Sequence, residues 1–253
     1  MANGLLSRFS RRNEPRNRDR HIDIDGWMLP VRVIEHPTSR RITLRLMPGG
    51  DGLKITMPAH VSDRELDEFL DRNRQWVSVR RARLPKTVSL DDGAIIPFKG
   101  IDHRIVHLDR LRGIVEAKPV AGEPSLLVPG DPARIGRRVV DFMKKQARGA
   151  LDEAVAQHAA ALGVRPRQIR ITDTTSRWGS CSSTRTLSFS WRIIMAPPEV
   201  LDYLAAHEVA HLREMNHSDR FWSHVRSICP EMETHKAWLR KNGSGLHAIT
   251  IAA

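Results

Sequence analysis

The sequence predicts an α+β protein with a strand-rich N-terminal part and a C-terminal part of helix, strands, helix and helix. Three observations support this fold class. Apolar and polar residues alternate between residues 21 and 57, as they do in strands. A long helical pattern covers residues 131–163. A second helical pattern covers residues 199–213 and has an inward face with apolar residues and two histidines spaced by three or four.

The N-terminal alternation is expected to begin an antiparallel sheet. Its second half, RITLRLMPGGDGLKITMP, contains PGGDG at residues 48–52, the kind of turn that reverses a hairpin. Ser62 and Glu65 have the spacing of a capping box. A helix is therefore predicted from about 63 to 82, ending before Pro85, with short strands after it.

The helical pattern that follows these strands places a domain boundary near residue 130. It runs to Gly163, a residue that commonly ends helices. We therefore expect three parts: a disordered basic arm over 1–20, a strand-rich subdomain with one helix over 21–130, and a C-terminal domain over 131–253. Within the last part, residues 167–197 are expected to form alternating strands with a Ser/Thr-rich turn.

Charge and cysteine content limit the class of protein. The 253 residues include 41 Lys and Arg against 29 Asp and Glu, a net charge of +12, and the pI is near 10.7. This excess indicates a solvated basic face or an anionic partner such as a nucleotide or nucleic acid. No run of about 18 apolar residues predicts a membrane span, and the N-terminal apolar run is too short for a secretory signal. Two cysteines cannot build a disulfide framework, so a cytoplasmic protein is expected.

The segment LAAHEVAHLREMNHSDRFW, residues 204–222, indicates a metal site. His207 and His211 lie one helical turn apart, so both imidazoles can bind one ion, and this geometry suits Zn²⁺. Glu208 lies about 100° further round the helix. It is therefore placed to accept a proton from a water molecule at the metal.

A third protein ligand is expected because a catalytic zinc has three, and His217 is the best candidate. Asn216 tolerates the left-handed conformation that ends helices, and Ser218 is a good N-cap for a following helix. A tight corner at these residues would return His217 toward the first helix. The competing ligands are Glu214, His224, Glu233 and His235.

The sequence resembles the YgjP-like (DUF45) metallopeptidases, relatives of the WLM and SprT-like zinc proteases. The resemblance rests on RWGSCSS (177–183), LSFSWRIIMAP (187–197), DYLAAHEVAHL (202–212) and NHSDRFW (216–222). It implies a zincin-like domain in which the motif helix packs on a small, mostly antiparallel sheet. It also implies zinc bound by His207, His211 and His217, with Glu208 as the catalytic acid and base.

Other residues near the motif are candidates for substrate contacts. An oxyanion would need a donor beyond the metal, and Arg177, Tyr203 and Asn216 are candidates, although Tyr203 also fits a buried core position. Gly179 and Ser180 would let an edge strand approach an extended peptide, or they form a turn held by Trp178.

Aromatic residues directly after His217 are expected to support the predicted corner. Phe221 and Trp222 open the next helix, where they would hold the His217 segment against the motif helix.

The leading functional prediction is a zinc-dependent hydrolase, most simply a peptidase that acts on a peptide or protein. A second hypothesis keeps the metal and makes the substrate a phosphoanhydride such as a nucleotide, which the positive charge favours. A third is a nucleic-acid-associated module in which the basic surface binds phosphates and zinc is structural or serves to process bound proteins.

Overall fold

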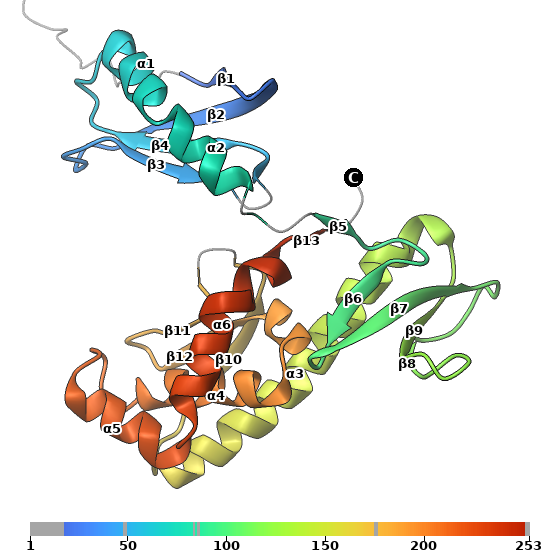
Figure 1. The fold of residues 1–253 in the computed structure, drawn as a ribbon. Coiled ribbons are helices and arrows are strands. Elements are labelled where there is room, and N and C mark those ends of the chain that lie inside the picture. Colours follow the sequence, from blue (N-terminus) through green and yellow to red (C-terminus); the bar gives the residue numbers. More distant parts are fainter. Residues whose placement is uncertain (1–17, 48–49, 83, 85–86, 175–176, 251–253) are drawn as a thin grey trace, which may run out of the picture. The chain divides into compact units, whose positions relative to one another are not determined.

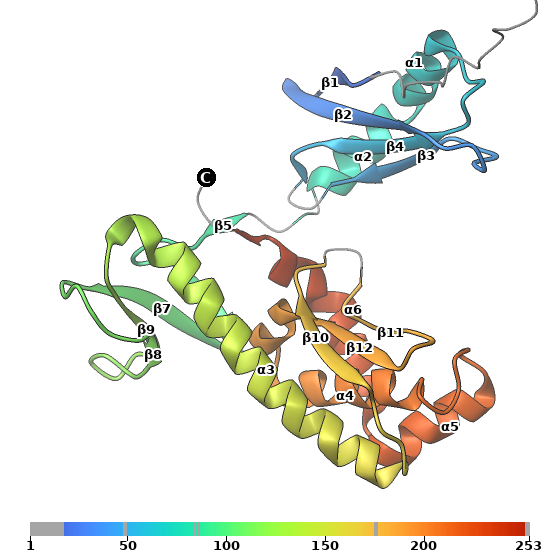
Figure 2. The same ribbon diagram turned by 180° about the vertical axis from the view of Figure 1, so that it is seen from behind.

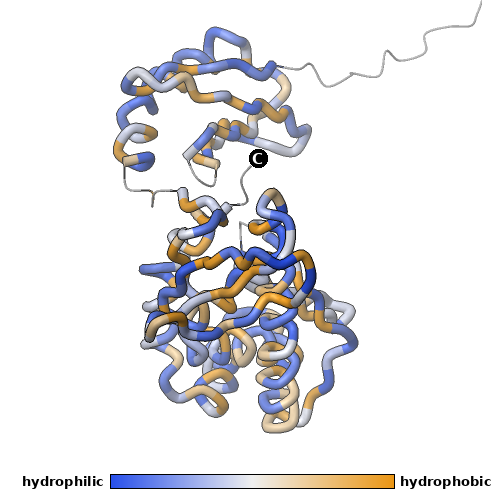
Figure 3. The backbone as a smooth tube through the Cα atoms, turned by 90° about the vertical axis from the view of Figure 1, so that its right-hand side faces the viewer, coloured by the Kyte–Doolittle hydropathy of each residue, from blue (hydrophilic) through white to orange (hydrophobic). Residues whose placement is uncertain are grey.

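The computed structural model describes residues 18–47, 50–82, 84, 87–174 and 177–250. By contact density the chain divides into an N-terminal unit that ends at Leu84 and a C-terminal unit that begins at Pro85. Both units combine helices with sheets, so the predicted α+β class is confirmed (Figure 1). In the tube view, hydrophobic and hydrophilic positions alternate along the backbone of each unit (Figure 3).

The N-terminal unit contains a four-stranded sheet in the order β1-β2-β4-β3. The strands are β1 (Arg20–Ile24), β2 (Trp27–Glu35), β3 (Thr43–Leu46) and β4 (Leu53–Met57). The predicted hairpin over 48–52 is confirmed by antiparallel pairing of β3 with β4, although residues 48 and 49 lie outside the described residues. The sheet is mixed rather than purely antiparallel, because β2 and β4 pair in parallel.

Two helices, α1 (Asp63–Arg72) and α2 (Arg74–Ala82), replace the single helix predicted over 63–82. The capping box is present, with the Ser62 hydroxyl accepting from the Glu65 backbone N–H and the Glu65 carboxylate accepting from the Ser62 backbone N–H. The break falls at Asn73, whose side-chain amide donates to the Phe69 carbonyl at 2.7 Å and so competes with continued helix.

Both helices cover one face of the four-stranded sheet, and the opposite face carries no other described element of the unit (Figures 1 and 2). The inward side chains of the strands alternate with exposed ones. They form a separate core with the helices, made of Ile22, Ile24, Leu29, Val31, Val33, Leu53, Ile55, Met57, Val61, Leu66, Leu70 and Val77.

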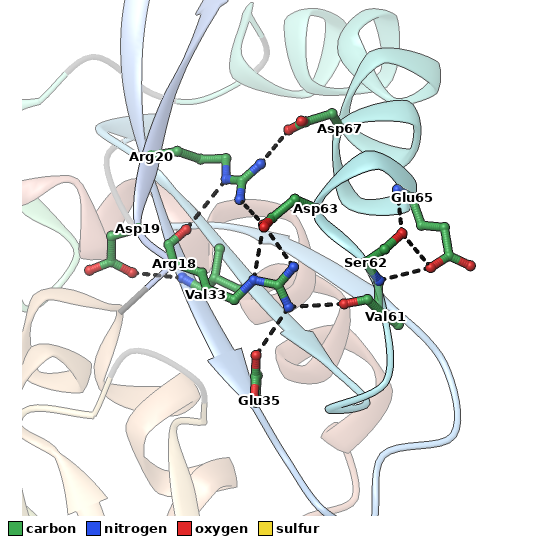
Figure 4. A network of polar contacts seen from close by, with 10 residues as sticks. All are labelled: Arg18, Asp19, Arg20, Val33, Glu35, Val61, Ser62, Asp63, Glu65 and Asp67. Carbon is green, nitrogen blue, oxygen red and sulfur yellow. Dashed lines mark hydrogen bonds and ion pairs between the residues drawn. The ribbon is translucent and has the colours of Figure 1, made fainter. Parts of the chain in front are cut away.

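The end of the predicted disordered arm is ordered, which corrects that part of the prediction. Arg18 donates to Asp63 at 2.7 Å and to Glu35 at 3.0 Å, and Arg20 binds Asp63 and Asp67 (Figure 4). These ion pairs anchor the chain beside the N-terminus of α1, where acidic residues are favoured. Residues 1–17 lie outside the described residues.

The C-terminal unit holds the remaining elements. It begins with β5 (Val88–Ser89), β6 (Ile95–Phe98), β7 (Ile101–Leu108), β8 (Glu116–Ala117), β9 (Ser125–Pro129), η2 (Pro132–Arg134) and α3 (Ile135–Ala161). It continues with β10 (Gln168–Thr172), β11 (Gly179–Cys181), β12 (Thr186–Ser190), η3 (Trp191–Met195), α4 (Pro198–Ala210), α5 (Asp219–Ile228), α6 (Met232–His247) and β13 (Ile249–Thr250).

The boundary predicted near residue 130 lies inside this unit, and the contact-based division falls at Leu84 instead. The reason is a shared core. Ile96, Ile105 and Leu126, from the sheet β6-β7-β9-β8, are buried in one cluster with Val139 and Met143 of α3. A strand block that buries its apolar face against α3 belongs to the same compact body.

The long helix α3 packs against α4 and η3, and its end is close to the prediction because Gly163 adopts φ +60°. The neighbouring sheet has the order β10-β12-β11, with one parallel and one antiparallel pairing, so the expected mostly antiparallel sheet is mixed. Strand was expected to continue to residue 197, but it ends at Ser190. All five side chains of η3 are buried, which a half-exposed strand does not allow.

Buried Arg192 in η3 connects three parts of this unit. Its guanidinium donates to the carbonyls of Leu246 at 3.1 Å and Ile249 at 2.6 Å, and to the carboxylate of Asp173 at 2.7 Å. The end of α6 and the segment after β10 are therefore joined to the turn that precedes α4. None of the helices in the described parts of the chain combines the length and apolar character needed to cross a membrane.

Candidate metal centre

Helix α4 presents the motif residues from the interior of the C-terminal unit. Pro198 occupies the first turn, where its missing N–H costs nothing. Most of the helix surface is buried against α3, α5, α6 and β11. His211 is the C-cap residue, so His207 and Glu208 lie in the last helical turn. This burial fixes the direction of the motif side chains.

The chain turns sharply between α4 and α5, and this corner places His217 beside His207 and His211. The Asn216 carboxamide oxygen accepts a hydrogen bond from the Ser218 backbone N–H at 3.0 Å, and the Ser218 hydroxyl caps α5 by accepting from the Phe221 N–H at 3.4 Å. The expected left-handed conformation of Asn216 is absent, since among described residues other than glycine a positive φ occurs at Asp25, Lys99, Ala121 and Arg185. Asn216 therefore turns the chain through its side chain.

The corner places three imidazoles around one point. One ligand atom each of His207, His211 and His217 lies within 4.8 Å of the others, and this group could hold a metal ion. The two Nε2 atoms of His207 and His217 are 3.1 Å apart. Two nitrogens on a tetrahedral zinc, each at about 2.0 to 2.1 Å, would lie roughly 3.3 to 3.4 Å apart, so the observed spacing fits an ion between them.

The protonation states of His207 and His211 also suit metal binding. Burial, followed by the neighbouring His211 and His217, lowers the pKa of His207 to about 3. Burial also lowers the pKa of His211. The His211 Nδ1 atom is 3.0 Å from the Glu214 carbonyl, which requires the Nδ1–H tautomer and leaves Nε2 as the ligand atom. Neutral imidazole is the form that binds metals.

Two aromatic rings support the imidazoles, at the positions expected from the sequence. The Phe221 ring lies 4.9 Å from His207, 4.4 Å from His211 and 4.7 Å from His217 by ring centroids. The Trp222 ring lies 5.7 Å from His207 and 5.6 Å from His217. Lys236, which sequence reasoning missed, places its ammonium 4.4 Å from the Trp222 ring centroid.

Glu208 is buried beside the imidazoles and against β11. It is 4% exposed, and its Oε2 atom has no hydrogen-bond partner among the described residues. Burial raises the pKa of Glu208 to about 8, and the positive charge of Arg177 opposes this shift. A Cβ atom on Gly179 would lie 2.4 Å from the Glu208 Oε1 atom. Only glycine therefore fits at the start of β11.

Strand β11 is an edge strand, because β12 is its only partner among the described strands. The Trp178 carbonyl accepts from the Ser190 N–H, and the Ser182 N–H donates to the Thr186 carbonyl. In an antiparallel pair every second residue bonds to the partner, so Ser180 also faces β12. The backbone groups of Gly179 and Cys181 therefore point to the open edge.

The remaining substrate-contact candidates have different surroundings. Arg177 is exposed, close enough to Glu208 to affect its pKa. Tyr203 is 5% exposed, packs in the cluster with Phe221, and lies 6.0 Å from the His207 ring. Burial raises the pKa of Tyr203 to about 12, which keeps the phenol neutral. Trp178 stacks on His247 with ring centroids 4.3 Å apart.

The competing third ligands do not join the histidine cluster. Among described residues, the only group of His, Cys, Asp and Glu that could hold an ion is the one formed by His207, His211 and His217. Glu214 contributes its backbone carbonyl, and Glu233 forms an ion pair with Lys236. His235 lies instead in a cavity of about 380 Å³ beside Cys229.

Paired histidines on a helix, a third from the following corner and a buried glutamate form the arrangement of a metal-dependent peptidase. The model of the YgjP-like metallopeptidase domain family matches residues 40–242, so the chain belongs to this family.

Solved structures were also compared. The chain is similar to the metallopeptidase zymogen abylysin of Pyrococcus abyssi, with 21% identity and TM-score 0.32, over 36% of this chain and 93% of that one. It is also similar to the metallopeptidase zymogen jannalysin of Methanocaldococcus jannaschii, with 23% identity and TM-score 0.30, over 34% of this chain and 93% of that one. No curated protein matched.

Proposed function

We propose that the protein is a zinc-dependent peptidase in which His207, His211 and His217 bind the metal and Glu208 transfers the proton. The observation that carries the proposal is the cluster of three imidazoles, together with the buried carboxylate of Glu208 on the same helix as two of them. Nitrogen ligands in a set of three suit Zn²⁺ with a fourth position open. The alternative substrate, a phosphoanhydride, has no comparable observation in its favour.

The chemistry divides between the ion and the side chains. When bound, zinc supplies Lewis acidity that polarises the scissile carbonyl and makes water easier to deprotonate. Glu208 accepts the proton of the attacking water and delivers it to the leaving amine. A nearby cation favours the charged form of a buried carboxylate, so the raised pKa of Glu208 falls toward the value a base needs once the metal is present.

The edge strand supplies a route for substrate binding within the same proposal. An extended peptide can add to β11 by main-chain hydrogen bonds with Gly179 and Cys181, the two residues whose backbone groups face the open edge. This assignment moves the expected contact at Ser180 to Cys181. It also places the peptide backbone next to Glu208, because Gly179 touches that carboxylate.

The test measures metal content and turnover in the same samples. Wild-type protein, loaded with one equivalent of zinc, is incubated with a peptide library and, separately, with nucleoside triphosphates. We expect cleavage of peptides and none of the triphosphates. Glu208→Gln removes the proton acceptor but none of the three ligands, so it should keep the metal and lose turnover. Wild-type turnover in the Glu208→Gln variant would end the general-base role, and triphosphate cleavage alone would end the peptidase assignment.

A further inference from the structure

A row of three cations crosses the open face of the N-terminal sheet. In the register of the strands, Arg32 of β2 is opposite Lys54 of β4, and Lys54 is opposite Arg45 of β3. All three are exposed, and each follows the alternation that points it away from the covering helices. Figure 2 shows this face of the sheet without a helix over it. The three residues are called the cation row below.

Within the described part of the chain, the side chains of the cation row make no ion pair or hydrogen bond. Cations that stabilise the same unit behave differently, since Arg18 and Arg20 are both paired with acidic residues at α1 (Figure 4). Like charges directly opposite each other destabilise a sheet. The cation row therefore destabilises the sheet, and no ion pair among the described residues offsets this repulsion.

The surroundings of the cation row keep its charge available. The next outward positions along the sheet are Ile34, Thr56 and Thr43, which carry no charge. Asp19, just before β1, places a carboxylate near the edge of this face, and that carboxylate accepts a hydrogen bond from the Val33 backbone N–H at 2.9 Å. A partner that approaches this face meets positive charge together with hydroxyl groups.

The spacing of the cation row identifies a suitable partner. Neighbouring strands lie about 4.7 to 4.9 Å apart, so three charges extend over roughly 10 Å. A nucleic acid strand carries one phosphate at every nucleotide and a layer of condensed counterions, which are released when cations neutralise the phosphates. An acidic peptide carries carboxylates only where its sequence supplies Asp or Glu. An uninterrupted row of three unpaired cations therefore favours the continuous charge of nucleic acid.

We propose that the open sheet face of the N-terminal unit binds the phosphate backbone of nucleic acid through Arg32, Arg45 and Lys54. The role is independent of the metal centre, because each contributing residue belongs to the other unit. It gives the basic surface expected from the sequence a defined location. A surface of this kind would hold the peptidase beside nucleic acid and the proteins bound to it.

The test measures binding of the full-length protein to a fluorescently labelled 20-nucleotide single strand as salt increases. The sheet variant Arg32→Gln/Arg45→Gln/Lys54→Gln is compared with the helix variant Arg64→Gln/Arg72→Gln/Arg80→Gln, which removes the same charge from the helix side of the same unit. Each lost phosphate contact lowers the slope of log K against log salt by about 0.7. Three contacts predict a slope change of about 2 and an affinity loss of about 100-fold at 0.1 M salt.

Controls separate binding from folding and from other anionic surfaces. Arg32→Lys/Arg45→Lys keeps the charge and should keep the wild-type slope. The single variant Lys54→Gln should lower the slope by about 0.7 if the triple variant is too unstable to test. Equal losses in the sheet and helix variants would overturn the proposal. So would a wild-type protein that fails to bind the strand, or that binds only phosphatidylserine vesicles.

Discussion

Replacement of Gly179 by alanine should slow catalysis at the metal centre without removing a metal ligand. The added Cβ would lie 2.4 Å from the Oε1 atom, 2.7 Å from Cγ and 2.8 Å from Cδ of Glu208. Carbon atoms in contact are normally about 3.5 to 4.0 Å apart, so the Glu208 side chain must move by about 1 Å. Strand β11 cannot easily move instead, because the carbonyl of the preceding Trp178 accepts a hydrogen bond from the Ser190 N–H and its ring stacks on His247.

The size of the effect follows from that displacement. A misplacement of about 1 Å in a catalytic group costs roughly 100-fold in rate, and overpacking of a buried site costs about 1 to 3 kcal/mol of stability. We expect Gly179→Ala to lower kcat about 100-fold on a quenched-fluorescence peptide that the wild type cleaves. Zinc content, measured by plasma mass spectrometry, should remain at the wild-type level because the three atoms nearest the added Cβ all belong to Glu208 and none to a histidine ligand.

The matched control is Gly149→Ala on α3, where an added Cβ meets no atom within 4 Å. Alanine is the better helix former by about 1 kcal/mol, so this variant should be slightly more stable and fully active. Wild-type kcat in Gly179→Ala would refute the reasoning, because it would mean that the position of the Glu208 carboxylate does not limit turnover. Loss of zinc in the same variant would also refute the reasoning, because it would show that the substitution disturbs the histidine ligands.

Three further predictions concern the same centre and one concerns the N-terminal unit. Burial raises the pKa of Glu208 from 4.5 to about 8, so its stabilising contribution is present below pH 4.5 and is lost as pH rises through 8. In chemical denaturation at pH 7, the free energy of unfolding of metal-free Glu208→Gln should therefore exceed that of metal-free wild type by up to about 3 kcal/mol. Near pH 4 the two free energies of unfolding should be equal. His217→Ala should bind well below one zinc per chain by mass spectrometry, whereas full occupancy would exclude it as the third ligand. Asn216→Ala removes the bond to Ser218 and should weaken zinc binding by about 10- to 100-fold in competition with a chelator; unchanged affinity would show that the corner forms without it. Ser62→Ala should cost about 1 kcal/mol in urea unfolding, and no loss would mean that the capping box does not stabilise α1.

Local patterns in the sequence were sufficient to predict several features. The period of the motif helix, the capping box at Ser62 and the N-cap at Ser218 each depend on residues within four positions of one another. The hairpin of β3 and β4 was predicted for the same reason. Where residues close in sequence determine the geometry, the sequence alone predicts it well.

Features set by contacts distant in sequence could not be predicted in this way. The domain boundary was misplaced because a strand block and α3 both look self-sufficient locally, although Ile105 and Leu126 share a core with α3. The approach of Gly179 to Glu208 joins two elements that no periodicity relates. The predicted left-handed conformation of Asn216 was wrong. A left-handed backbone and a side-chain hydrogen bond can both turn a chain, and the sequence does not distinguish them.

The pairing of β13 with β5 constrains the order in which the two units can fold during synthesis. Strand β5 follows directly after the N-terminal unit, but its parallel partner is formed by residues 249–250. Arg192 likewise donates hydrogen bonds to the carbonyls of Leu246 and Ile249, which are synthesised 54 and 57 residues later. On the ribosome the N-terminal unit can fold early, because its sheet and helices are contiguous in sequence. The C-terminal unit can therefore complete these contacts only after residue 250 has emerged from the ribosome.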